Sequence, residues 1–138
     1  MSDTFILDAC ALIALFARES GYENVKELIQ DAIDGNSIVK INQINLLEVY
    51  YHVCNVYDQN EANKAVEKIR EYPIKIIIGL NEDVFKEAGR IKSKYKIPLG
   101  DSIVVAECII GGGILVTSDH TDLEKIEKAE NIKINWFR

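Results

Sequence analysis

Apolar and polar residues follow two periods along this chain, and the periods predict strands and helices in turn. Short runs rich in Ile and Val, typical of strands, lie at 4–7, 37–41, 74–78, 114–117 and 132–137. Apolar positions at helical spacing predict helices over 9–17, 22–34, 43–57, 60–71, 81–95, 101–110 and 121–129. This alternation predicts an α/β fold, a three-layer α/β/α sandwich with a central, mostly parallel sheet of about five strands.

One segment, IPLGDSIVVAECIIGGGILVTSDHTD at 97–122, organises this pattern. It predicts a turn, a buried helix, a glycine break, a buried strand and an acidic loop. Asp101 lies where the N-cap of that helix is expected, and Asp119 lies just past the end of the strand. Because open parallel sheets bind ligands outside the carboxyl ends of their strands, we expect the functional site at this edge.

Length and composition narrow the function classes. The 138 residues predict a single domain, 1–138, and 48% apolar with 28% charged residues is typical of soluble proteins. We expect a cytoplasmic protein with no membrane association, because the sequence lacks a long apolar run and a basic N-terminal signal, and its three cysteines are scattered. The net charge of −6 argues against coating duplex nucleic acid, but it leaves a focused, metal-bridged site open.

Four acids stand almost alone in otherwise apolar segments, and these are Asp8, Glu48, Asp101 and Asp119. Asp8 and Asp101 are equally well explained as helix N-caps, and Asp119 as a surface loop acid. Glu48 is harder to explain in this way, because an unpaired buried carboxylate is costly. No Lys or Arg lies within one helical turn of any of them. If the four converge, their repulsion predicts a bound cation, and ligation by oxygen alone suits Mg²⁺ or Mn²⁺.

The segments that contain these acids are FILDACALIALFARESG, INLLEVYY, IPLGDSIVVAECIIGGGILVTSD and the HTDL that follows. In order and spacing, over nearly the whole chain, the sequence resembles the PIN-domain ribonucleases and, within them, the VapC-type toxins of toxin–antitoxin pairs. The resemblance implies a metal-dependent endoribonuclease that hydrolyses RNA phosphodiester bonds, a cognate antitoxin as partner, and a homodimer.

The resemblance also implies roles for individual residues around one or two Mg²⁺ or Mn²⁺ ions. The implied catalytic and metal-binding quartet is Asp8, Glu48, Asp101 and Asp119. Thr117 occupies the family's Thr-x-Asp position and would hold the last Asp or its water, and Asp122 matches an acid of less fixed role. Where the family often has Ser or Thr, this chain has Ala9.

The local sequence around the quartet refines these expectations. Asn45 lies one helical turn before Glu48 and either bonds that carboxylate or bonds the backbone as an inward polar residue. Asp8 and Asp101 lie on rigid elements, so we expect them to bind metal directly, with Glu48 and Asp119 acting through metal-bound waters. A carboxylate-held metal supplies the activated water and charge stabilisation that phosphodiester hydrolysis needs.

The helices at 43–57 and 60–71 contain more apolar surface than one small domain needs, which also predicts a homodimer. This surface includes Tyr50, Tyr51, Val53 and Tyr57. The basic cluster at 86–96 is either an RNA backbone track or, slightly favoured, a solvated helix face. Its cationic members are Lys86, Arg90, Lys92, Lys94 and Lys96. We expect His120, beside Asp119, to be a bystander.

Two other functions are alternatives. A haloacid-dehalogenase-type phosphatase needs a second Asp two residues after the first, and Cys10 stands there instead. A non-catalytic interaction module would use the acids as helix caps or bind a basic partner peptide in an acidic pocket. Such a module with scattered caps has no tight Mn²⁺ site, and this distinguishes it from the nuclease.

Overall fold

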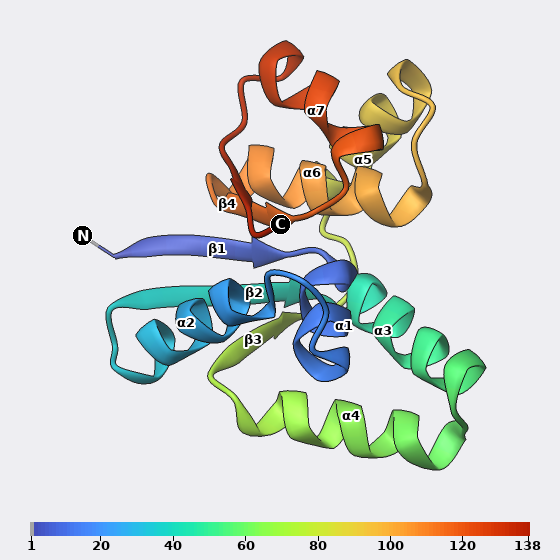
Figure 1. Ribbon diagram of the computed structural model, residues 1–138. Helices are drawn as coiled ribbons and strands as arrows, with labels where there is room; N and C mark the ends of the chain where they lie inside the picture. The colour runs from blue at the N-terminus through green and yellow to red at the C-terminus, as the bar shows by residue number, and fades with distance from the viewer. Residues whose placement is uncertain (1) are drawn as a thin grey trace.

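Five parallel strands form the centre of the structure in the order β3-β2-β1-β4-β5 (Figure 1). The computed structural model describes residues 2–138. The strands are β1 (Asp3–Leu7), β2 (Ser37–Asn42), β3 (Ile74–Ile77), β4 (Ile114–Thr117) and β5 (Ile134–Trp136). The helices within the described residues are α1 (Ala9–Ala17), α2 (Tyr22–Ile33), α3 (Gln43–Val56), α4 (Gln59–Glu71), α5 (Glu82–Lys94), α6 (Leu99–Gly111) and α7 (His120–Ala129). The predicted three-layer α/β/α fold is confirmed.

Side chains of the central strands alternate between two cores, as expected for a sheet covered on both faces. Phe5 and Leu7 pack with α1 and α2, whereas Ile6, between them, packs with α6 and α7. Figure 1 shows the corresponding layers, with α5, α6 and α7 on one side of the sheet and α1 to α4 on the other. No helix in residues 2–138 is long and apolar enough to cross a membrane.

The strand order reverses at β1, which brings the functional residues together. From β1 the chain moves outward through β2 and β3, and then returns to place β4 and β5 on the other side of β1. The carboxyl ends of β1 and β4 are therefore neighbours, and Leu7 of β1 lies beside Val116 of β4. The connections of the two strands leave in opposite directions at this switch point, where open α/β sheets bind their ligands.

One predicted helix start is wrong. α6 begins at Leu99, and Pro98 occupies its N-cap position, where Asp101 was expected. Proline lacks an N–H and has a restricted φ, so it suits the boundary of a helix, and its carbonyl accepts a hydrogen bond from Ser102 N at 3.1 Å. Asp101 therefore lies inside the first turn, and its carboxylate is not used in capping this helix.

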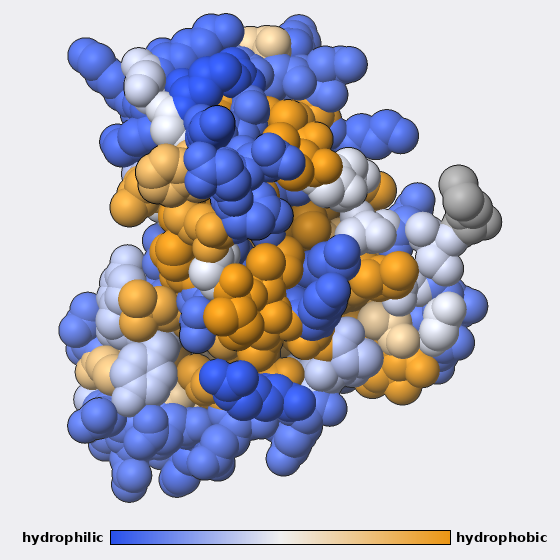
Figure 2. All heavy atoms as spheres, turned by 180° about the vertical axis from the view of Figure 1, so that it is seen from behind, coloured by the Kyte–Doolittle hydropathy of each residue, from blue (hydrophilic) through white to orange (hydrophobic). Residues whose placement is uncertain are grey.

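Large apolar side chains remain exposed on several elements. Figure 2 shows apolar residues gathered over the middle of the face opposite to that in Figure 1. On α3 and at its end, four such side chains are half or more exposed, and these are Leu47, Tyr51, Val56 and Tyr57. Exposed apolar surface of this kind is available for contact with another protein.

Candidate active site

Asp8 follows β1 directly and is held by three donors. It is the N-cap of α1, as the capping alternative predicted, and Oδ1 accepts a hydrogen bond from Ala9 N at 2.8 Å. Thr117 Oγ1 donates to Asp8 Oδ2 at 3.0 Å, and the Cys10 thiol approaches the same oxygen at 3.6 Å. The carboxylate of Asp8 is buried, so these bonds fix its orientation at the end of the strand.

Thr117 joins the ends of β1 and β4. Besides donating to Asp8, its hydroxyl accepts a hydrogen bond from Asp119 N at 3.1 Å. Asp119 in turn is the N-cap of α7, and its Oδ1 accepts from Asp122 N at 3.2 Å. The hydroxyl of the buried Thr117 thus positions Asp8 by bonding its carboxylate and Asp119 by bonding its backbone N–H.

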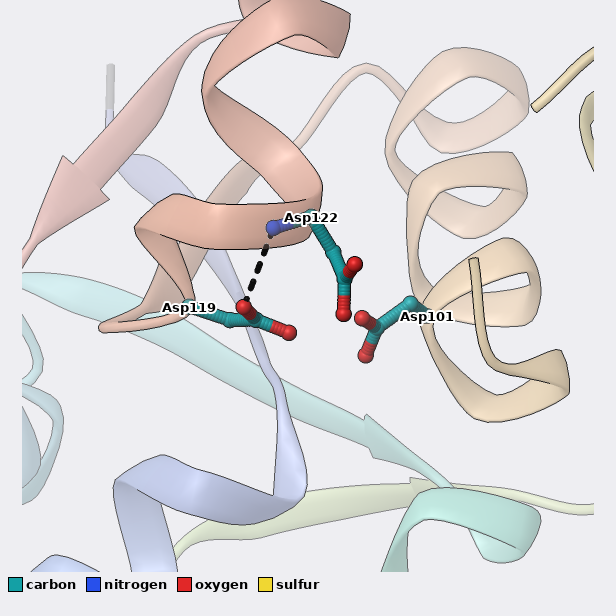
Figure 3. A group of neighbouring side chains, drawn as sticks. All are labelled: Asp101, Asp119 and Asp122. Carbon is teal, nitrogen blue, oxygen red and sulfur yellow. Dashed lines mark hydrogen bonds between the residues drawn. The ribbon is translucent and has the colours of Figure 1, made fainter. Parts of the chain in front are cut away.

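Three carboxylates, one on α6 and two at the start of α7, face one another. Figure 3 shows Asp119 and Asp122, from the start of α7, pointing toward Asp101 on α6. One oxygen from each of the three lies within 4.8 Å of the others. Asp101 is 7% exposed, and its buried Oδ2 has no hydrogen-bond partner in residues 2–138. Asp122, to which the sequence assigned only a supporting place, is thus part of the tightest acidic group.

Glu48 and Asn45 lie beside this group on α3. Asn45 Nδ2 donates to Glu48 Oε1 at 3.0 Å and to the Gly100 carbonyl at 3.1 Å, so both bonding alternatives for Asn45 are realised. A Cβ atom on Gly100 would clash with the Glu48 carboxylate. The absence of a side chain at Gly100 therefore lets the Glu48 carboxylate sit against the first turn of α6, next to Asp101.

The acids of the site repel one another, and burial penalises their charged forms. Burial, followed by the charge of Asp8 and contact with Asp119, raises the pKa of Asp101 to about 9. Burial is also the largest cause that raises the pKa values of Asp8, Glu48 and Asp122. No basic side chain in the described part of the chain forms an ion pair with any of these acids. Ionising the whole group therefore requires an added cation.

The donor set fits a hard divalent ion. The available atoms are carboxylate oxygens, one of them buried without a partner, and such oxygens suit Mg²⁺ and Mn²⁺. Cys10 is the one soft donor nearby, and burial raises the pKa of its thiol to about 12. It therefore stays protonated and serves as a hydrogen-bond donor, a contact that sequence reasoning missed.

Cations of the basic cluster at 86–96 form ion pairs with acids that lie outside the acidic site. Arg90 and Lys94 both pair with Glu130, which follows the C-terminal end of α7, and Lys86 pairs with Glu82. α7 has 10 residues, so Glu130 lies roughly 15 Å along the helix from its N-cap Asp119. These cations therefore do not neutralise the acidic site, and the contacts favour the interpretation as a solvated helix face.

Comparisons with known proteins agree with this fold. The model of the PIN domain family matches residues 5–129. VapBC2 from Rickettsia felis, bound to a DNA fragment from its promoter, aligns over 96% of this chain and 97% of that chain, with a TM-score of 0.71 and 17% identity. DNA-bound VapBC from Salmonella typhimurium aligns over 100% of both chains, with a TM-score of 0.72 and 14% identity.

A toxin–antitoxin complex from Klebsiella pneumoniae aligns over 88% of this chain and 91% of that chain, with a TM-score of 0.61 and 21% identity. These solved structures share the fold of this chain. Among curated proteins, none matches the sequence.

We expect Asp101→Asn to stabilise the metal-free protein at neutral and alkaline pH. The folded-state pKa of about 9 lies above the usual 3.8, so ionisation of Asp101 disfavours the folded state. This cost is absent below pH 3.8 and grows as the pH rises to about 9. Urea unfolding in excess chelator at about pH 4 and about pH 8 measures the free energy of unfolding of both proteins. The variant should be more stable than its parent only at the higher pH.

The matched control is Asp31→Asn, which removes an exposed carboxylate from α2. It should change the free energy of unfolding little at either pH. A parental protein as stable as the Asp101→Asn variant at both pH values would contradict the repulsion described above.

Proposed function

The chain belongs to the PIN-domain family, and from this premise we propose that it is a metal-dependent endoribonuclease, the toxin of a toxin–antitoxin pair. The observation that supports the proposal most directly is the convergence of Asp101, Asp119 and Asp122 without a cationic partner in residues 2–138. Together with Asp8 and Glu48, this group forms an acidic site on one domain that spans 1–138. The substrate is RNA, and the proposed location is the cytoplasm.

In this proposal the acids hold Mg²⁺ or Mn²⁺. Asp101, Asp119 and Asp122 are the nearest set, and the charge of Asp8 acts on both Asp101 and Glu48. A divalent ion bound there would activate water and stabilise the negative charge that develops on the phosphate. The direct role of Asp8 and the water-mediated role of Asp119 stay predictions, although the geometry favours Asp119 as the closer partner of Asp101.

The surrounding residues of the chain orient the acids. Thr117 fixes the carboxylate of Asp8 and the backbone of Asp119, and Asn45 fixes the carboxylate of Glu48. Both donors are fully buried, so they hold the acids in defined orientations. Preorganisation of this kind is what an electrostatic catalyst needs, since little rearrangement remains for the reaction itself.

A cognate antitoxin is the proposed protein partner. The Klebsiella structure is a toxin–antitoxin complex, and it aligns with 88% of this chain. A cluster of carboxylates on a protein of net charge −6 attracts Arg and Lys side chains. We therefore propose that the antitoxin places a basic side chain in the acidic site, where it competes with metal.

We expect Asp101→Asn to reduce cleavage of structured RNA in Mg²⁺ by orders of magnitude, because the substitution keeps the shape of the residue and removes a metal-binding charge. Gel-resolved cleavage rates of the parent, Asp101→Asn and Asp31→Asn measure the effect, with circular dichroism as the check of folding. Excess chelator should abolish cleavage by the parent, and Mn²⁺ should restore it.

Two outcomes would refute the nuclease assignment. One is an Asp101→Asn protein that cleaves at the parental rate, and the other is parental cleavage that persists in chelator. If the folded parent cleaves no RNA at all but binds a basic peptide, the chain is the non-catalytic interaction module.

We also propose a homodimer that uses the exposed face of α3. Leu47 and Tyr51 lie one helical turn apart on α3, 56% and 50% exposed. Light scattering at micromolar concentration should give twice the chain mass of 15.6 kDa. Leu47→Asp should shift the mass toward the monomer, and Ile33→Asp on α2 should not, because it charges an exposed apolar residue elsewhere. A parental protein that is strictly monomeric would contradict the proposal.

A further inference from the structure

An aromatic pair stands immediately beside the acidic site. His120 is the first residue of α7 and directly follows Asp119, the N-cap of that helix. Its ring stacks on the indole of Trp136, with centroids 4.1 Å apart and an interplanar angle of 15°. Trp136 lies opposite Thr117 in the pairing of β5 with β4. The pair therefore occupies the same carboxyl edge of the sheet as the carboxylates.

The histidine ring is held in place and stays partly open to solvent. Its Nε2 lies 2.8 Å from the Arg138 carbonyl oxygen, and its Nδ1 lies 3.7 Å from a Glu124 carboxylate oxygen. The side chain of His120 is 48% exposed, although one ring face is against Trp136. A fixed, flat and accessible ring of this kind can stack with another planar group.

Arg138 adds a cation next to the stack. Its guanidinium donates to Ser118 Oγ at 3.0 Å, to the Ser20 carbonyl at 3.2 Å and to a Glu19 carboxylate at 3.3 Å. These bonds use both hydrogens of Nη1 and one of Nη2. Of the five N–H groups of an arginine, those left without a partner among residues 2–138 are Nε–H and one on Nη2. Ser118, which accepts one of these bonds, directly precedes Asp119 in the chain.

We propose that His120, Trp136 and Arg138 form a subsite for one nucleotide of single-stranded RNA, next to the phosphodiester that is cleaved. The nucleobase stacks on the open face of the His120 ring, and Arg138 binds a phosphate of the same strand. This inference rests on the proposed ribonuclease function and adds how the substrate is bound. The expectation that His120 is a bystander would then be replaced by a binding role.

The chemistry of the three residues matches RNA. Carboxylates alone repel a polyanion, so the substrate needs a cation and a stacking surface close to the acids. Aromatic stacking accepts any base, and it requires a base that is not already stacked in a duplex, which favours single strands and loops.

Fluorescence anisotropy with labelled hexauridine tests the subsite without relying on cleavage. All substitutions are made in the Asp101→Asn protein, in Mg²⁺, so that the RNA stays intact. His120→Ala should weaken binding about tenfold, and His120→Phe, which keeps a stacking ring, should bind within about twofold of its parent. Arg138→Gln should weaken binding and reduce the slope of log K against log [salt] by about one, the equivalent of one phosphate contact. The control Arg70→Gln, on the exposed face of α4, should change neither.

A set of hexauridines, each with one abasic position, identifies the base that stacks. When the missing base is the one that stacks on His120, the protein that keeps His120 and the His120→Ala protein should bind that RNA equally. Equal binding of intact hexauridine by both proteins would overturn the subsite and leave the nuclease assignment standing. Loss of binding in His120→Phe as large as in His120→Ala would overturn the stacking role. If the Asp101→Asn protein and its parent bind no hexauridine, both the subsite and the ribonuclease proposal fail.

Discussion

Repulsion among closely spaced carboxylates is the constraint on which the rest of this structure depends. Asp101, Asp119 and Asp122 present oxygens within 4.8 Å of one another at the switch point of a parallel sheet. Burial and like charge together raise the pKa of Asp101 to about 9. Such a group is costly to the fold unless a cation joins it, because the charges have no basic partner in the described residues. The site thus lowers metal-free stability and creates affinity for a divalent ion.

The surrounding fold keeps this unfavourable group in place. Asp8 and Asp119 satisfy the first N–H groups of α1 and α7, so each acid also contributes to the stability of a helix. Thr117 links the two through its hydroxyl, and the missing side chain at Gly100 allows Glu48 to approach α6. Removing an acid therefore has two opposed effects, the loss of a cap or contact and the relief of repulsion. Asp101 does not cap its helix, so relief dominates there.

The sequence predicted those parts of the site that depend on single elements. Asp8 and Asp119 follow strands whose ends are visible as Ile- and Val-rich runs, so their common edge could be predicted. The helix containing Asp101 was placed two residues late, because an Asp and a Pro both suit a helix start. Asp122 joins the group only through the turn made by the Asp119 cap, and Gly100 matters only because α3 and α6 meet. The capping turn is local, but the approach of Asp122 to Asp101 and the meeting of α3 with α6 are tertiary, and no local pattern contains them.

Calorimetric titration with Mn²⁺ tests the central claim most directly. At about pH 7 the metal-free Asp101 carboxyl is protonated, since its pKa is about 9, so binding should release about one proton. Titrations in buffers of different ionisation enthalpy count that proton. We predict one saturable Mn²⁺ site with proton release in the parent and in Asp31→Asn, and strongly weakened binding without that release in Asp101→Asn. Absence of Mn²⁺ binding by the parent, or equal binding with equal proton release in Asp101→Asn, would contradict the account.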